Sequence, residues 1–372
     1  MLAPRTPRSS AACAAAASAD MTSYPPSSLP TPEEEIWRYS RIDELDLAAY
    51  APGPIEAAVS GWTPVADAVV DGVEPAADVF AELNAGLAAP VVLRIPPGHT
   101  AADPIEVVWR APVDGAAVFP RLIVETGPDA DVTIVERFAS DDVSALVVPV
   151  TQLRAGPGAR LRYLATNELG PRVWQIAHQV GRAERDSYTL LATVALGGYY
   201  ARVRTDARLD GAGATGEQIA AYFGAGDQMH DFRTLQDHVG PKSTSTLLFK
   251  GAVADEARSA YSGLIRIRRG AAGTSALQTN RNLILSDTGL ASYSVPNLDI
   301  EENDVTCSHA SATGPIDADQ RFYLESRGVP PDVADRLIVL GFFAELVERL
   351  PSAGLRAHLS EVIGTKLGVA RA

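Results

Sequence analysis

Cysteine is scarce in this sequence, and long apolar runs are missing. The 372 residues include two cysteines, Cys13 and Cys307, which are too few for a disulfide framework and fit a reducing cytoplasm. No stretch approaches the roughly 20 apolar residues that a transmembrane helix needs, so we expect no membrane association. Basic residues are outnumbered, 32 against 46 acidic ones, for a formal net charge of −14. This balance argues against nucleic acid as the main partner, because phosphate binding needs a basic surface.

The nucleotide-binding and hydrolase motifs are incomplete. Residues 211–216 match G-x-G-x-x-G, but residues 206–210 before them are charged at every second position, which is typical of a half-exposed strand. We therefore interpret the motif as a glycine-rich turn between strands. Lys242 lacks the adjacent glycine of a phosphate-binding loop, and Ser262 lacks the two glycines of a nucleophile elbow. We expect neither ATP binding nor catalysis by this chain.

The N-terminal part divides into two zones. Residues 1–28 are interpreted as a disordered tail or as a mis-assigned start, with Met21 as the working start. A cleaved targeting segment is the alternative. Without this tail, Cys307 is the one remaining thiol. Residues 29–90 are predicted to be helical. A capped helix start at Thr31 and apolar residues at helical spacing over 76–87 support this prediction.

Residues 91–312 form a long series of short strand-like runs separated by Gly, Asp, Asn and Pro. The runs cover 91–95, 105–110, 121–125, 132–138, 145–150, 160–165, 189–196, 201–205, 246–253, 263–269 and 282–286. No helix-length pattern interrupts them, which excludes alternating β-α units. A barrel, a propeller or a β-solenoid remains, and the lack of a fixed-length repeat disfavours a propeller. A solenoid tolerates irregular rungs, because each rung contacts only its neighbours.

The last zone, residues 313–372, is predicted to be helical again. Asp317 is placed to cap a helix over 318–327, and Gly328 to end it. A second helix should run from the proline pair before Asp332 to Leu350. Its predicted apolar stripe consists of Val333, Leu337, Leu340, Ala344 and Val347, and further apolar residues widen it. Such a helix packs against the rest of the chain or against another protein, and the pattern leaves both open.

Cys307 and His309 are the strongest chemical signal. In an extended segment, positions i and i+2 project to one face, which would place a thiolate beside an imidazole. Both are good ligands for iron or zinc, but they are only half of a metal centre, so a partner chain would supply the rest. The alternatives are a buried apolar Cys307 with a structural His309, or a cysteine–histidine nucleophilic pair. His230 and His238 are too far apart on one strand to form a metal pair, and are interpreted as hydrogen-bonded or surface histidines.

Several short motifs near the C-terminus occur together. They are Pro296-Asn297-Leu298-Asp299-Ile300, Asp304-Val305-Thr306-Cys307-Ser308-His309, Gly314-Pro315-Ile316-Asp317, Phe322-Tyr323-Leu324, Ser326-Arg327-Gly328 and Gly341-Phe342. In combination they resemble the signature of the SufB/SufD family of iron–sulfur cluster assembly proteins. Upstream, Lys250-Gly251 and Gln278-Thr279-Asn280 also fit, and Leu29-Pro30-Thr31-Pro32 with Trp37-Arg38-Tyr39 resembles the SufD branch. The resemblance covers about residues 29–368.

The resemblance implies a mainly β protein, a right-handed parallel β-helix with helical N-terminal and C-terminal regions. It also implies a non-catalytic scaffold subunit that pairs with SufB through the β-helix and binds the SufC ATPase through the C-terminal helices. The family signature assigns His309, with Cys307 as its neighbour, to transient cluster assembly at the SufB interface. The implied cargo is a nascent iron–sulfur cluster, with sulfur from a cysteine desulfurase and flavin as a further candidate cofactor of the complex. The expected ATPase-docking residues are Phe322, Tyr323, Arg327, Gly328, Leu337, Gly341 and Phe342.

Two alternatives remain open from the sequence. The first is a SufB-like paralogue of the same complex. The second is a β-solenoid hydrolase or lyase acting on polysaccharide, which needs two carboxylates on one strand face. The acidic ridge from Asp299 to Asp304, with Glu301, offers candidates for that chemistry.

Overall fold

The computed structural model describes residues 29–66, 68, 74–111, 113–285, 292–351 and 353–369. The predicted tail at 1–28 lies outside the described residues, as does residue 286 at the end of the last predicted strand run. Among the described helices, none is long and apolar enough to cross a membrane.

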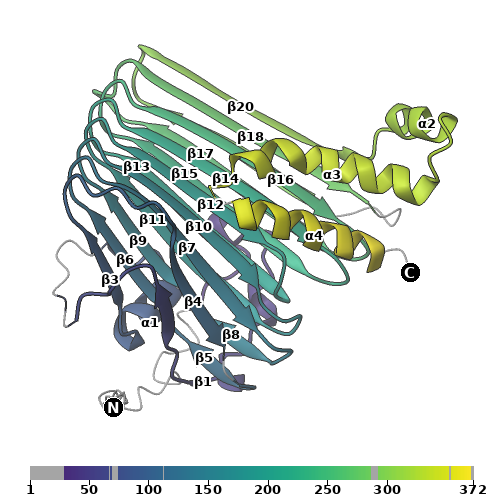
Figure 1. The fold of residues 1–372 in the computed structure, drawn as a ribbon, viewed down its shortest axis with the longest axis horizontal. Coiled ribbons are helices and arrows are strands. Elements are labelled where there is room, and N and C mark those ends of the chain that lie inside the picture. The colour runs from purple at the N-terminus through teal and green to yellow at the C-terminus, as the bar shows by residue number, and fades with distance from the viewer. Residues whose placement is uncertain are drawn as a thin grey trace, which may run out of the picture.

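Strands make up most of the described chain, with helices near both ends (Figure 1). The N-terminal elements are the 3-10 helices Glu35–Trp37, Ile42–Glu44 and Leu47–Ala49, the strands β1 (Ala51–Pro52) and β2 (Ala57–Ser60), and α1 (Val79–Leu87). Then follow β3 (Val91–Ile95), β4 (Ile105–Ala111), β5 (Ala116–Val118), β6 (Arg121–Thr126), β7 (Asp131–Ser140), β8 (Ala145–Val147), β9 (Val150–Ala155), β10 (Arg160–Glu168), β11 (Trp174–Ala183), β12 (Tyr188–Ala195), β13 (Tyr200–Leu209), β14 (Thr215–Gly224), β15 (Met229–His238), β16 (Thr244–Val253), β17 (Arg258–Ile267), β18 (Thr274–Ile284), β19 (Ser292–Ile300) and β20 (Val305–Pro315). The C-terminal helices are α2 (Ala318–Ser326), α3 (Pro331–Arg349) and α4 (Ala353–Val369).

The strands form two sheets whose members alternate along the chain. One sheet has the order β1-β5-β8-β11-β13-β15-β17-β19, with β3, β6 and β9 beside it, and the other has the order β2-β4-β7-β10-β12-β14-β16-β18-β20. All described pairings are parallel except the antiparallel pair β2–β4. Tyr200, Met229 and Arg258 are successive register partners, so a turn there is 29 residues long. The chain therefore winds as a solenoid, and the predicted parallel β-helix is confirmed.

The glycine-rich segment 211–216 forms a corner of this solenoid. Gly213 has a φ of +72°, and a Cβ atom on it would lie 2.4 Å from Asp186 Oδ1 in the turn below. A Cβ on Gly211 would lie 2.0 Å from the backbone nitrogen of Arg185. Glycine is required there because successive turns stack so closely. The prediction of a turn between strands is confirmed.

The N-terminal zone contains less helix than the sequence predicts. α1 is present, but residues after Thr31 form turns and 3-10 helices rather than an α-helix. Side chains of the solenoid supply the reason. Arg202 donates from Nη2 to the carbonyl oxygen of Ile36, and Arg233 donates to that of Arg38. These oxygens are thus bonded to arginines of β13 and β15, and the segment lies along the first sheet as an irregular strap.

The C-terminal zone is helical as predicted. The Asp317 carboxylate accepts from the backbone nitrogens of the first turn of α2, and Gly328, with a φ of +84°, follows its end. α3 and α4 lie side by side across the second sheet, while α2 projects beyond it (Figure 1). Their shared core joins Val339, Phe343 and Leu346 of α3 to apolar residues of β12, β14 and β16.

Candidate functional site

The last turn of the solenoid is formed by β19 and β20, at the end opposite to α1 (Figure 1). β19 pairs with β17, and β20 pairs with β18. Within the described part of the chain, no further strand lies beside either of them. Both sheets therefore end in a strand whose outer backbone groups have no ladder partner, which is a ready template for another chain.

The interior of the solenoid is open at this end. Leu298 and Ile300 of β19 are register partners of Ile265 and Ile267, which are fully buried. Leu298 itself is 40% exposed and Ile300 42% exposed. They continue the apolar interior by one turn, without another turn to cover them. Solenoids need a polar cap at their ends, so this uncapped end is a surface suited to a partner.

Cys307 and His309 lie on β20 at this open end. Their register partners are Ala276 and Gln278, whose side chains are buried inside the solenoid, so Cys307 and His309 face the interior too. Cys307 is half-buried and packs against the apolar cluster around Ile265. Burial raises the pKa of its thiol, so that metal binding would have to displace the proton. His309 is exposed.

These two side chains do not make a complete metal site. Among the described residues, no group of three or more His, Cys, Asp or Glu side chains is placed to hold a metal ion. A tetrahedral iron or zinc centre needs about four ligands. Cys307 and His309 therefore supply two donors at an open edge, and their predicted role in cluster assembly stays a prediction.

The two upstream histidines are interior residues of β15. His238 is hydrogen bonded through Nδ1 to Ser243 Oγ and through Nε2 to Ser245 Oγ, both at 2.7 Å. Burial lowers the pKa of His238 to about 4 and that of His230 to about 3. Both are neutral at physiological pH, and the interpretation as hydrogen-bonded histidines is confirmed for His238.

Two carboxylates of the acidic ridge are engaged within the last turn of the solenoid. Asp299 forms an ion pair with Arg266 at 2.9 Å. Glu302 accepts from the backbone nitrogens of Gly270 and Asn303. These carboxylates hold the last turn together, and this arrangement gives no support to the polysaccharide-cleaving alternative.

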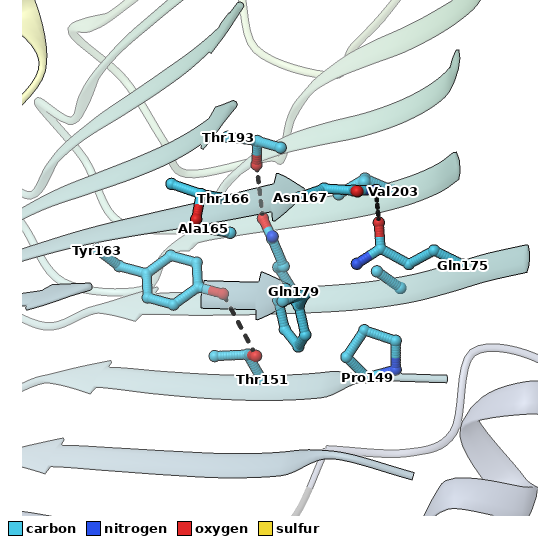
Figure 2. Close-up of a pocket in the computed structure, with 12 residues that line it drawn as sticks. Pro149, Thr151, Tyr163, Ala165, Thr166, Asn167, Gln175, Gln179, Thr193 and Val203 are labelled. Atoms are coloured by element: carbon cyan, nitrogen blue, oxygen red, sulfur yellow. Dashed lines mark hydrogen bonds between the residues drawn. The ribbon is translucent and has the colours of Figure 1, made fainter. Parts of the chain in front are cut away.

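A small interior pocket lies farther from the open end (Figure 2). All twelve residues that line it are buried, and its volume of about 10 Å³ suits about one water molecule. Next to it, Glu136 accepts from Trp109, Thr151 and Tyr163. Burial raises the pKa of Glu136 despite these bonds. Sequence alternation did not single out Glu136, and a pocket with room for about one water molecule is too small to be a substrate site.

The surface expected to dock an ATPase lies on α2 and the start of α3. Phe322 is 71% exposed, Tyr323 58% and Leu337 49%. Arg327, whose guanidinium lies 5.3 Å from the Tyr323 ring centre, is also exposed, and so are Gly328 and Gly341. Phe342 differs from the other six, because it packs towards the solenoid with Lys250 Nζ 5.1 Å from its ring centre.

The apolar stripe predicted for α3 is only partly covered by the solenoid, because Leu340 and Val347 pack against the shared core while the other members do not. Val333, Leu337 and Ala344 are exposed, whereas Ala334, Asp335, Val339, Phe343 and Leu346 are buried. A helix that is apolar on nearly all sides does not reveal which side packs. The solenoid covers one side of α3, and the side with Val333 and Leu337 stays uncovered by the described residues.

Comparison with known proteins identifies the family. The sequence model described as SUF system FeS cluster assembly, SufBD core domain, matches residues 109–342. The chain belongs to the SufBD family. An iron–sulfur cluster assembly SufBD family protein of Mycobacterium tuberculosis is 30% identical over 92% of this chain and 90% of its own length. The iron–sulfur cluster assembly protein SufD of Bacillus subtilis is 30% identical over 80% of this chain, and that of Escherichia coli 28% identical over 78%.

For this SufBD chain, the matched range covers the solenoid from β4 through β20 and reaches into α3. It includes both Cys307 and His309 and the open end on which they lie. The resemblance inferred from the short motifs is confirmed, including the similarity to SufD proteins.

Proposed function

We propose that this SufBD chain is a non-catalytic, SufD-like scaffold subunit of a SufBCD iron–sulfur cluster assembly complex in the cytoplasm. The observation that carries the proposal is the uncapped end of the solenoid, with Cys307 and His309 facing its interior. A scaffold of this kind holds a cluster between two chains and does not itself need a catalytic group or an ATP site.

The open end suits pairing with a SufB subunit. A second solenoid end would cover Leu298 and Ile300, and it could hydrogen bond to the free edges of β19 and β20. Such pairing brings the partner's ligands to the edge at which Cys307 and His309 lie. Because this chain supplies two donors, a SufB-type partner would supply the others.

The nascent cluster is the cargo of this interface. Cys307 would bind iron as a thiolate and His309 as a neutral imidazole, so binding releases the thiol proton. Sulfur would come from a cysteine desulfurase. Flavin, the further cofactor that the resemblance implies, would belong to the assembled complex.

The exposed face of α2 and α3 suits the SufC ATPase. Phe322 and Tyr323 of α2 and Leu337 of α3 are exposed apolar side chains. α2, which carries the first two, projects from the solenoid (Figure 1). Exposed aromatic side chains of this kind are typical anchors of protein interfaces. ATP-driven movement of SufC would act on this surface and, through α3, on the solenoid.

Co-expression with the partner subunits tests the proposal. The His309→Ala variant should assemble with SufB and SufC but yield a complex that carries less iron and acid-labile sulfide after reconstitution. Ser308→Ala, on the opposite face of β20, is the matched control and should behave as wild type. Unchanged cluster content in His309→Ala would make His309 a structural residue.

Identification of the co-purified chains separates the alternatives. Recovery of SufB and SufC supports the proposal. Recovery of SufC with a SufD subunit would make this chain the SufB-like paralogue. Recovery of neither subunit, together with cleavage of polysaccharide, would overturn the proposal in favour of a solenoid hydrolase or lyase.

A further inference from the structure

One interior column of the second sheet ends at His309. The in-register residues of β14, β16, β18 and β20 are Gln218, Leu247, Gln278 and His309. Side chains at register partners of a parallel sheet point the same way, and neighbouring strands are about 4.8 Å apart. Gln278 is therefore the residue directly beneath His309, and Leu247 lies beneath Gln278.

Gln278 is buried without satisfied hydrogen bonds. Its exposed fraction is 0%, and neither its Nε2 nor its Oε1 has a hydrogen-bond partner in the described part of the chain. Leu247 below it offers none. A buried amide in this state costs about 1–3 kcal/mol, so its presence calls for a specific explanation.

The opposite sheet leaves room for this amide. Gly263 of β17 faces it across the interior, and a Cβ atom on Gly263 would lie 2.6 Å from Gln278 Nε2 and 2.2 Å from the hydroxyl of Tyr261. Any larger residue at position 263 would displace the Gln278 side chain. The interior is thus shaped to keep an extended polar side chain one turn below the open end.

The imidazole of His309 is the polar group nearest along the column. In the described residues, no hydrogen bond is formed by the His309 ring. An imidazole that binds metal through one nitrogen usually donates its other N–H to an oxygen acceptor, which fixes the tautomer and the ring orientation. The amide oxygen of Gln278 is an acceptor of the required kind.

We propose that Gln278 is a positioning residue for His309. Within the described residues neither group is bonded, so the imidazole has to turn about its side-chain torsions until its N–H reaches the amide oxygen, which leaves the second ring nitrogen as the donor that faces the open end and the cluster. The role of this hydrogen bond in cluster binding rests on the proposed function. The hydrogen bond itself can be tested on this chain without any partner.

Three variants of the full-length chain test the hydrogen bond. Gln278→Met keeps the volume and removes the acceptor, and Gln278→Glu keeps an acceptor. Gln218→Met is the matched control, because Gln218 belongs to the same column two turns farther from His309 and is equally buried. Gln218→Met should lose more stability than Gln278→Met, because Gln218 donates to two backbone carbonyls whereas Gln278 has no hydrogen-bond partner among the described residues, so a loss of stability is not a readout of the proposal.

The first readout is the tautomer of His309, measured by nitrogen-15 NMR on the chain labelled at histidine and assigned with His309→Ala. We expect one dominant tautomer in the wild type, in Gln278→Glu and in Gln218→Met, and a mixture typical of free imidazole in Gln278→Met. An unchanged tautomer in Gln278→Met would overturn the positioning role.

The second readout is the iron content of the reconstituted SufBCD complex. Gln278→Met should lower it by about tenfold, as the loss of a hydrogen-bond partner of a metal-binding histidine commonly does, and Gln278→Glu should restore most of it. Equal loss in Gln218→Met would show a general effect of the interior and would overturn the inference. If the tautomer changes as expected while His309→Ala retains its clusters, the hydrogen bond stands and the proposed function fails.

Discussion

Lys366 of α4 donates from Nζ to the carbonyl oxygen of Phe223 at 2.8 Å, at the end of β14. The same ammonium bonds to the carbonyl of Leu196 and, at 2.9 Å, to Gln228 Oε1. Lys250 of β16 makes the corresponding link to α3. It donates to the carbonyl oxygen of Phe342 and to the carboxylate of Glu345. Two lysines thus join the C-terminal helices to the solenoid. A force applied to α3 by a partner would therefore reach the strands.

Replacement of Lys366 by methionine should loosen α4. The change leaves two carbonyl oxygens without their donor, which costs about 1–3 kcal/mol of unfolding free energy. We expect a lower urea midpoint and faster amide hydrogen exchange in α4 than in the solenoid. Lys242→Met is the control, because Lys242 is exposed on a turn. Equal exchange in α4 of both variants would contradict the link.

The pH dependence of this link follows from burial, which lowers the pKa of Lys366 from 10.5 to about 8. Between these two values the unfolded chain binds a proton that the native chain does not. Stability therefore rises with pH over that interval, and the cost of burying the charge is fully present below pH 8. The difference in unfolding free energy between wild type and Lys366→Met should accordingly move in favour of the wild type from pH 8 to pH 10. A constant difference would exclude this titration.

Acid should destabilise the chain through its interior histidines. The native pKa values of about 3 for His230 and about 4 for His238 lie below the usual value of 6.5, because burial disfavours the charged ring. The unfolded state thus binds more protons, and stability falls as the pH drops from 6.5 towards 4. His238→Gln should show a shallower fall in urea unfolding experiments than the wild type. His309→Gln, at an exposed position, is the control for the replacement itself.

The sequence predicted the strand zone well where a short run is rich in β-branched and other apolar residues, as in β3, whose bounds match the predicted run 91–95. It missed β11 and β14, because both faces of these strands carry small or polar residues. Gln218 shows the physical reason. Its Nε2 donates to the carbonyls of Thr205 and Leu235 inside the solenoid, so that a polar residue occupies an interior position without forming an exposed face.

The site could be predicted only in part. Two-residue periodicity was enough to place Cys307 and His309 on one face of a strand, and the structure has them there. The open end and the unsatisfied amide of Gln278 depend on register between strands about 30 residues apart, for which the local pattern carries no signal. The buried side of α3 was left open by the sequence for a related reason, since it is set by contacts with strands far away along the chain.

Leu337 and Phe342 separate docking from folding on α3. Leu337→Glu places a charge on the exposed side, so the melting temperature should stay within about 2 °C of wild type while SufC is lost from pull-downs. Phe342→Ala removes contacts with the solenoid core and should cost about 2 kcal/mol in urea unfolding. Retention of SufC by a folded Leu337→Glu variant would remove the α2–α3 surface from the ATPase interface.

Ile300 provides the direct test of pairing through the open end. Its side chain continues the interior column above Ile267 but is 42% exposed, so a lysine there can extend into solvent in the isolated chain. In a paired solenoid the same ammonium would be buried without a counter-charge, which is costly. Natural edge strands carry inward-pointing charges of this kind to prevent association. We expect the Ile300→Lys variant to have the melting temperature of the wild type and to retain SufC. It should no longer elute together with SufB in size-exclusion chromatography. Val113→Lys, at an exposed apolar residue next to β4, controls for added charge. Normal SufB binding by Ile300→Lys would mean that the two chains pair through another surface, and that Cys307 and His309 do not face a partner.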